Sequence, residues 1–232
     1  MCNPQNPAGN IWDRETLARI GALCKQYDVI VVSDEIHCDL TKPGTEYIPF
    51  ASVDDTCRDI SVTCIAPTKT FNLAGLQTAA VYAENSILHH RMWRQLNTDE
   101  VAEPNAFAIQ ATIAAFQYGE EWLDELREYV EKNKQYVTEF LQEKIPLIHP
   151  VAGDATYLMW LDCRKITESG RQFAKFIRKT SGLYVSGGNQ YGKGGEGFLR
   201  VNVATSKLVV EDGMQRLYES VDAWLKEEKI SK

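Results

Sequence analysis

One lysine of this 232-residue chain stands in a segment that is otherwise mostly small and apolar. Lys69 lies within the run CIAPTKTFNLAGL, residues 64–76. A surface lysine needs no such setting. A lysine that reacts as a free amine benefits from it, because desolvation disfavours the ammonium form. For any single lysine the simpler expectation is still that the amine reaches solvent, so Lys69 is a candidate nucleophile that needs support from other residues.

A second candidate, Asp34, lies near the end of the apolar run VIVVSDE, residues 29–35. An isolated buried carboxylate is costly, so an acid at the end of a buried strand needs a partner. That partner is either structural, such as a helix terminus or a basic side chain, or a bound cation such as a protonated ring nitrogen. The local sequence leaves these alternatives even.

Three further side chains have both a structural and a functional explanation. Arg200 lies between apolar residues of a predicted strand, where its guanidinium either pairs with an acid of the protein or binds a ligand carboxylate. Asn6 belongs to a segment rich in proline and glycine, so turn formation is its simpler explanation. His37 is most simply a histidine of the interior. The glycine-rich residues 187–197 lack the spacing of a phosphate-binding motif, and we expect a loop beside the site.

The elements that must position these residues alternate between helix and strand in the first half of the chain. The run at 29–35 has no polar alternation, which is typical of a parallel strand buried on both faces. Two more strands are predicted at 61–67 and 78–84, on either side of Lys69. This order indicates a three-layer α/β domain, in which chemistry gathers beyond the carboxyl ends of the strands. A preceding helix at 13–27, capped by Asp13, carries an apolar stripe of Leu17, Ile20, Leu23 and Cys24.

The second half of the chain has a different pattern. Its predicted helices are 105–119, 120–145, 170–182 and 210–229, and its predicted strands are 155–163, 183–188 and 198–204. The sequence therefore predicts an α/β domain at residues 1–118 and a smaller α+β domain at residues 119–232.

Composition excludes several classes of partner. The net charge of −7 and the pI of about 5.2 argue against a nucleic-acid or anionic-membrane surface. No apolar run reaches the length of a membrane span, and the first residues do not follow the pattern of a signal peptide. The six cysteines form no C-x-x-C pair, so we expect reduced thiols in a cytoplasmic protein rather than disulfides or a metal site.

The order of these candidates carries more weight than any one of them. An N-P-x-G turn is followed by an apolar strand ending in aspartate, by a lysine about 35 residues later, and by a strand arginine near the C-terminus. This series resembles the class I/II aminotransferases, which are pyridoxal 5'-phosphate (PLP) enzymes of fold type I. The segments SDEIHCDL, APTKTFNLAGLQ, ATYLMWLDCR and GFLRVN are similar to the cystathionine β-lyase, or C–S lyase, branch of that family.

The resemblance implies a role for each candidate. Lys69 would hold PLP covalently and then act as the base on the Cα proton of the substrate. Asp34 would pair with the pyridine nitrogen, and Asn6 would donate to the phenolic oxygen of the ring. Arg200 would hold the substrate carboxylate and so orient the Cα–H bond. The same residues serve a lyase and an aminotransferase.

Three departures from the family pattern lie around the lysine and the aspartate. His37 stands where many aminotransferases have tyrosine, which favours the lyase branch, and it could still bind the ring oxygen. Ala66 and Gln77 stand where many have a serine and an arginine that bind the phosphate. Thr68 remains a candidate phosphate donor. We therefore expect a phosphate site with less positive charge.

The resemblance predicts a partial fold type I domain, residues 1–118, followed by the small domain. The parent enzyme would be a homodimeric C–S β-lyase that converts cystathionine or cysteine S-conjugates into pyruvate, ammonia and a thiol. The alternatives are an aminotransferase and a non-catalytic structural or regulatory remnant. The chain opens directly on the turn-rich MCNPQNPAGN, and the N-terminal half of the family, with its main phosphate loop, is not in it. We expect exposed sheet edges, and weak or absent PLP binding and inactivity for this chain alone.

Overall fold

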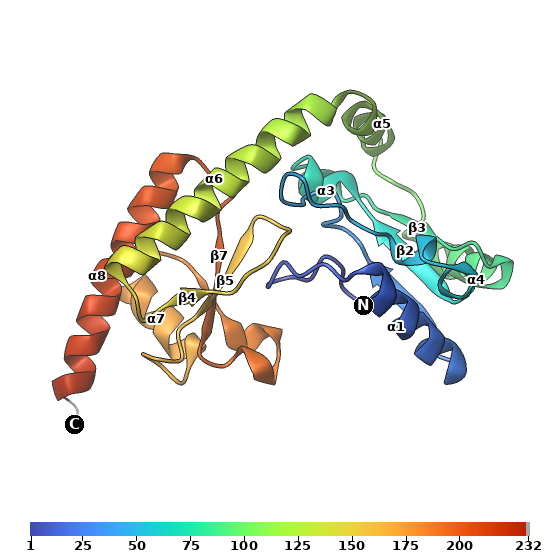
Figure 1. Cartoon of the computed structure of the whole chain (residues 1–232). Coiled ribbons are helices and arrows are strands. Elements are labelled where there is room, and N and C mark those ends of the chain that lie inside the picture. The colour runs from blue at the N-terminus through green and yellow to red at the C-terminus, as the bar shows by residue number, and fades with distance from the viewer. Residues whose placement is uncertain (231–232) are drawn as a thin grey trace. The chain divides into compact units, whose positions relative to one another are not determined.

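The computed structural model of the chain describes residues 1–230, which form two compact units (Figure 1). Unit 1 comprises Met1–Asn6, Asn10–Arg127 and Asp154–Thr156, whereas unit 2 comprises Pro7–Gly9, Glu128–Gly153 and the chain from Tyr157 onward. The long helix α6 (Glu120–Lys144) runs through the boundary at Arg127. The ranges 1–118 and 119–232 given above stay a prediction.

Unit 1 is a small sheet with helices. Its helices are α1 (Arg14–Gln26), α2 (Asp55–Asp59), α3 (Pro67–Thr70), α4 (Ser86–Thr98) and α5 (Ala108–Tyr118), and its strands are β1 (Val31–Asp34), β2 (Ser61–Ile65) and β3 (Ala80–Tyr82). The strand order is β1-β2-β3, with β1 parallel and β3 antiparallel to β2. The three strands lie inside the predicted ranges, and α4 was not predicted.

The helix α1 begins as its sequence predicts. The Asp13 carboxylate accepts a hydrogen bond from the Thr16 amide at 2.7 Å, which satisfies a free donor of the first turn. The core beside it consists of Leu17, Val31, Phe50, Cys57 and Ile60. Gly21 permits this packing, since a Cβ there would lie 2.3 Å from the Cys57 sulfur. Leu23, which was placed in the apolar stripe, is instead 48% exposed.

The prediction that β1 is buried on both faces is wrong. Its residues alternate, with Val31 and Ser33 buried and Val32 and Asp34 exposed. The core packs on the Val31 side of the strand, and Val32 remains 54% exposed. An apolar run shows that both faces of a strand tolerate burial, but it does not show that both are covered within the same chain.

Unit 2 holds a four-stranded antiparallel sheet with the order β4-β5-β7-β6. Its strands are β4 (His149–Pro150), β5 (Leu158–Asp162), β6 (Ser186–Gly187) and β7 (Phe198–Asn202), and its helices, besides most of α6, are α7 (Gly170–Ser181) and α8 (Lys207–Ile230). The helices α7 and α8 pack together, with the Phe173 and Trp224 rings 5.2 Å apart. Gly182 ends α7 in the left-handed conformation, which confirms the predicted stop.

Three general features concern membrane spans, cysteines and metal ligands. Among the described residues, no helix combines the length and the apolar character that a bilayer crossing requires. All six cysteines are free thiols, as the sequence predicts. Among the side chains that the structure describes, no group of three or more His, Cys, Asp or Glu residues could hold a metal ion.

Candidate active site

The aspartate and the lysine follow neighbouring parallel strands of unit 1. Asp34 is the last residue of β1 and is paired in register with Cys64 of β2. The strand β2 ends at Ile65, and the short helix α3 with Pro67 at its first position begins two residues later and carries Lys69. The carboxyl ends of β1 and β2 thus bring an acid and an amine to one edge of the sheet.

The backbone of Asp34 is held from the N-terminal segment of the chain. Its amide donates to the Met1 carbonyl at 2.8 Å, and its carbonyl accepts from the Asn3 amide at 3.1 Å. Its side chain is exposed and accepts one hydrogen bond, from the Ile36 amide at 3.3 Å. The expectation of a buried carboxylate is therefore wrong for Asp34, because the alternation along β1 turns this side chain away from the core.

The neighbouring Glu35 is the buried acid, with 2% of its surface exposed. Its Oε1 accepts from the Ser33 hydroxyl at 2.8 Å and from the Phe50 amide at 3.1 Å. Burial raises the pKa of Glu35, although both hydrogen bonds oppose the shift. Sequence reasoning missed this residue. The signal was the alternation of side chains along a strand. Glu35 lies two and four residues after the buried Ser33 and Val31, so its side chain points to the same face.

The residues after Lys69, unlike Lys69 itself, anchor the helix α3. Thr70 is fully buried and donates from its hydroxyl to Asp39 at 2.9 Å. Phe71 packs edge-on against Phe116 of α5, with ring centroids 5.3 Å apart. The Lys69 side chain is exposed. This exposure agrees with the simpler expectation, in which the Lys69 amine reaches solvent, and not with the alternative of a desolvated lysine.

Three other candidates of unit 1 are more enclosed. His37 is 3% exposed, in the turn that follows β1, and its carbonyl accepts from the Leu40 amide at 3.0 Å. Thr68 is half-buried on α3. Asn6 is half-buried, and its carbonyl accepts from the Gln5 side chain at 3.0 Å. Beside His37, burial raises the pKa of the Cys38 thiol to about 12, which keeps that thiol protonated.

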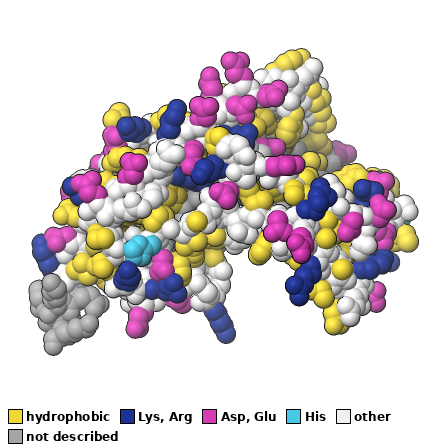
Figure 2. All heavy atoms as spheres, viewed as in Figure 1, with side chains coloured by type: hydrophobic (Ala, Val, Ile, Leu, Met, Phe, Trp, Pro, Cys, Tyr) yellow, Lys and Arg dark blue, Asp and Glu magenta, His cyan; other side chains and the backbone are white. Residues whose placement is uncertain are grey.

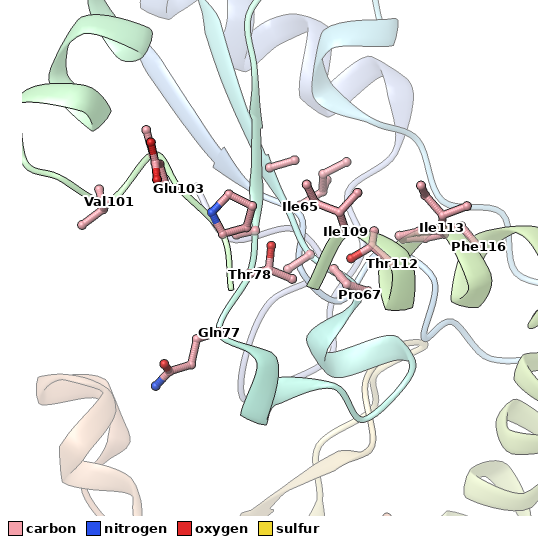
Figure 3. A pocket seen from close by; sticks show the side chains of 15 residues that line it. Ile65, Pro67, Gln77, Thr78, Val101, Glu103, Ile109, Thr112, Ile113 and Phe116 are labelled. Carbon is pink, nitrogen blue, oxygen red and sulfur yellow. The ribbon is translucent and has the colours of Figure 1, made fainter. Parts of the chain in front are cut away.

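A cavity of about 390 Å³ lies beside the lysine helix in unit 1. Figure 3 shows its lining, which comes from the end of β2, from β3, from α5 and from the segment 101–104. Ala66 and Gln77, the two residues that depart from the family's phosphate pattern, both line it. Its one ionisable lining residue is the acid Glu103, and no lysine or arginine of the described chain lines it.

The sixth candidate, Arg200, belongs to unit 2 and lies on β7. It is paired with Trp160 on β5 and with Ser186 on β6. Its guanidinium lies over the ring of Tyr191, with Cζ 5.0 Å from the ring centroid. Sequence reasoning did not identify Tyr191.

Comparison with known proteins gives a consistent result. The family model of aminotransferase class I and II matches residues 1–217. The cystathionine beta-lyase PatB of Bacillus subtilis is 42% identical over 217 residues, covering 94% of this chain and 56% of PatB.

Two solved structures extend the comparison to the fold. Cystalysin of Treponema denticola, which contains pyridoxal 5'-phosphate, superposes with a TM-score of 0.92 at 28% identity, covering 96% of this chain and 56% of that chain. The PLP-bound C-S lyase of Staphylococcus hominis superposes with a TM-score of 0.85 at 34% identity, covering 95% of this chain and 57% of that chain.

The chain thus spans just over half the length of these relatives, and within that span it has their mixed α/β fold. It belongs to the class I and II aminotransferase family.

Proposed function

We propose that this chain is the lysine-bearing part of a PLP-dependent C–S β-lyase that acts on cystathionine or cysteine S-conjugates. The observation that carries the proposal is the 42% identity to a cystathionine beta-lyase over 94% of this chain. In this chain, Asp34 ends β1 and Lys69 follows the neighbouring strand β2. The activity of the whole enzyme is part of the proposal, because the chain covers 56% of that relative.

The residues of unit 1 fit the ring end of PLP better than its phosphate end. An amine at Lys69 suits the aldehyde carbon, and a carboxylate at Asp34 suits the ring nitrogen. The cavity lined by Ala66 and Gln77 offers no cation to a phosphate, and it carries Glu103. We therefore expect this chain alone to bind PLP weakly.

When bound, PLP supplies an electron sink next to the Cα atom of an amino-acid substrate. Lys69 would carry the cofactor and, once released, would take the Cα proton at Nζ. That proton is then available to the departing sulfur, so one amine serves as base and acid. Asp34 would keep a proton on the ring nitrogen through its negative charge.

The remaining candidates would orient the reactants. His37 and Asn6 would bind the ring oxygen, and the Thr68 hydroxyl would bind the phosphate. Arg200 would bind the substrate carboxylate with its planar fork of donors. A homodimer and a cytoplasmic location belong to the same proposal. They are supported by the exposed apolar side chains of unit 1 and by the free thiols.

Product analysis of the chain with excess PLP tests the proposed reaction. Without added cofactor we expect the chain to be inactive because it binds PLP weakly, and excess PLP offsets that weakness. Pyruvate and a thiol formed from cystathionine, at a low rate, would then support a lyase. Lys69→Ala should abolish the products, whereas Lys175→Ala, an exposed lysine of α7, should leave them unchanged.

Two other outcomes would replace the proposal. A keto acid that forms only when a second keto acid is added would indicate an aminotransferase, as the family name allows. Absence of any product, together with unchanged absorbance of added PLP, would favour the non-catalytic alternative.

A further inference from the structure

The glycine-rich loop 187–197 brings an aromatic ring to Arg200. Tyr191 is the last residue of the short 3-10 helix Gly188–Tyr191 within this loop. Its ring centroid lies 5.0 Å from the Arg200 Cζ, which is within the range of a cation–π contact. The loop therefore contributes a side chain to the surroundings of the arginine, although its sequence carries no phosphate-binding pattern.

The Tyr191 ring packs on Trp160, which in turn packs on Phe198, and together they form what we call the aromatic platform: Tyr191, Trp160 and Phe198. Trp160 meets Tyr191 edge-on, with ring centroids 5.5 Å apart. Trp160 also stacks on Phe198, with ring centroids 5.1 Å apart and an angle of 5° between the ring planes. Trp160 and Phe198 are each 9% exposed. Edge-on and stacked contacts both stabilise aromatic pairs, so the ring of Tyr191 has a defined position.

Two glycines allow the loop to lie close to this platform. A Cβ on Gly188 would lie 2.2 Å from the Gly195 carbonyl oxygen and 2.6 Å from the Trp160 ring. A Cβ on Gly195 would lie 2.0 Å from the Gly188 carbonyl oxygen. Neither position accepts a larger residue without moving the backbone. The glycine content of the loop thus follows from close packing onto Trp160.

We propose that Tyr191 is a positioning residue that orients the Arg200 guanidinium for the carboxylate of the amino-acid substrate. This inference rests on the proposed function, in which Arg200 binds that carboxylate. The Arg200 Cζ lies over the Tyr191 ring, and a cation–π contact attracts the charge of the guanidinium as a whole, whereas a carboxylate binds its N–H donors. The contact therefore restricts the arginine side chain before the substrate arrives, and less conformational entropy is lost when the substrate binds.

A spectroscopic test examines the positioning without any need for activity. In ¹H–¹⁵N spectra of the full chain, the Arg200 Nε–H signal should be shifted by the ring current of Tyr191, and Arg200→Lys assigns it. Tyr191→Leu should move the signal to the position of an unstacked arginine, and Tyr191→Phe should retain the shift, because the ring and not the hydroxyl makes the contact.

A matched control exists in the same unit. Tyr184 lies under Arg178, with Cζ 5.1 Å from the ring centroid, and is 70% exposed. Tyr184→Leu should move the Arg178 signal and leave that of Arg200 in place. An Arg200 signal that is unchanged in Tyr191→Leu would overturn the proposal.

A kinetic test then connects positioning to the substrate. With excess PLP, Tyr191→Leu should raise the KM for cystathionine about three- to tenfold, the size of one cation–π contact, with kcat nearly unchanged. Tyr191→Phe and Tyr184→Leu should match the unmodified chain. An unchanged KM in Tyr191→Leu would overturn the role in substrate binding.

The two tests separate the two proposals. If the unmodified chain forms no product, the proposed function fails for this chain, and the Arg200 signal alone decides whether Tyr191 positions the arginine. A lower melting temperature of Tyr191→Leu with an unchanged Arg200 signal would identify Tyr191 as a packing residue of the loop and contradict the inference.

Discussion

Unit 2 buries its apolar residues, whereas unit 1 leaves many of its own exposed. In unit 2 the fully buried large side chains include Val137, Leu141, Ile148, Leu161, Phe173, Ile177, Leu199, Val203, Met214 and Leu217. The corresponding side chains of unit 1 include Leu17 and Phe50. Figure 2 shows hydrophobic side chains gathered over α5, where Phe107, Ile109, Ile113, Phe116 and Tyr118 are each at least half exposed.

The unit that buries more apolar surface is not the unit that holds most of the candidate site residues. Unit 2 packs its sheet and helices with its own residues, and it contributes one candidate site residue, Arg200. Unit 1 carries the other five candidates, and its three-stranded sheet packs on a small core. Burial of apolar surface is the main stabilising term in folding, so we expect unit 2 to be the more stable unit.

Removal of a ring from the core of unit 2 should have the largest effect. Phe173→Ala deletes a fully buried side chain that contacts Trp224, and it should lower the free energy of unfolding by about 3–5 kcal/mol. Urea titration measures this. Trp93→Ala, which removes a 57% exposed ring of unit 1, is the matched control and should cost about 0.5 kcal/mol or less. Equal costs for the two variants would contradict the comparison.

Amide hydrogen exchange should show the same contrast in the unmodified chain. The amides of β5 and β7, which pair along five residues, should exchange at rates governed by unfolding of the whole unit. The amides of β3, a three-residue edge strand with an exposed Tyr82, should exchange faster through local opening. Stronger protection in β3 than in β5 would refute the assignment of the more stable unit.

The buried acid of unit 1 should make stability depend on pH. Burial raises the folded-state pKa of Glu35 above its ordinary value of 4.5. A raised pKa means that the protonated form favours folding. The stabilising contribution is therefore complete below pH 4.5 and is lost as pH rises through the folded pKa.

Glu35→Gln isolates this contribution. An amide keeps an acceptor for Ser33 and Phe50 but cannot ionise, so the variant should gain stability relative to the unmodified chain as pH increases above 4.5. Urea midpoints over a pH series measure the difference. A difference that stays constant with pH would exclude Glu35 as its source.

The smallest effect on stability is expected at Lys69. Its side chain is exposed, so Lys69→Ala should change the free energy of unfolding by less than about 0.5 kcal/mol. Thr70→Ala, one residue away, removes a buried hydroxyl that bonds Asp39 and should cost about 1 kcal/mol or more. A larger loss for Lys69→Ala than for Thr70→Ala would assign the lysine a structural role.

Local signals in the sequence predicted most of the elements. Asp13 and Gly182 mark helix ends by the chemistry of their own side chains and backbone, and both act as expected. The helix α4 was missed although Asn85 caps it by accepting from the amides of Ile87 and Leu88. Its apolar residues Leu88, Met92 and Leu96 recur every four positions and are half-buried, so the same signals that predicted the other helices were present here.

The site was harder to predict because it depends on which faces are covered. The sequence placed Asp34 and Lys69 at strand ends or in the loops after them, but it did not show that Glu35, and not Asp34, points into the core. That outcome depends on where α1 packs. Tyr191 was missed for a similar reason, since only the folded loop brings it onto Arg200.

The central claim is that the Lys69 amine carries the cofactor, and chemical trapping tests it most directly. The chain is incubated with PLP, reduced with borohydride, digested, and searched by mass spectrometry for the modified lysine. We predict that the label concentrates on Lys69, and that the Asp34→Ala variant retains less of it because the ring nitrogen loses its partner. A label spread evenly over surface lysines, with Lys69 no more modified than Lys175, would contradict the account.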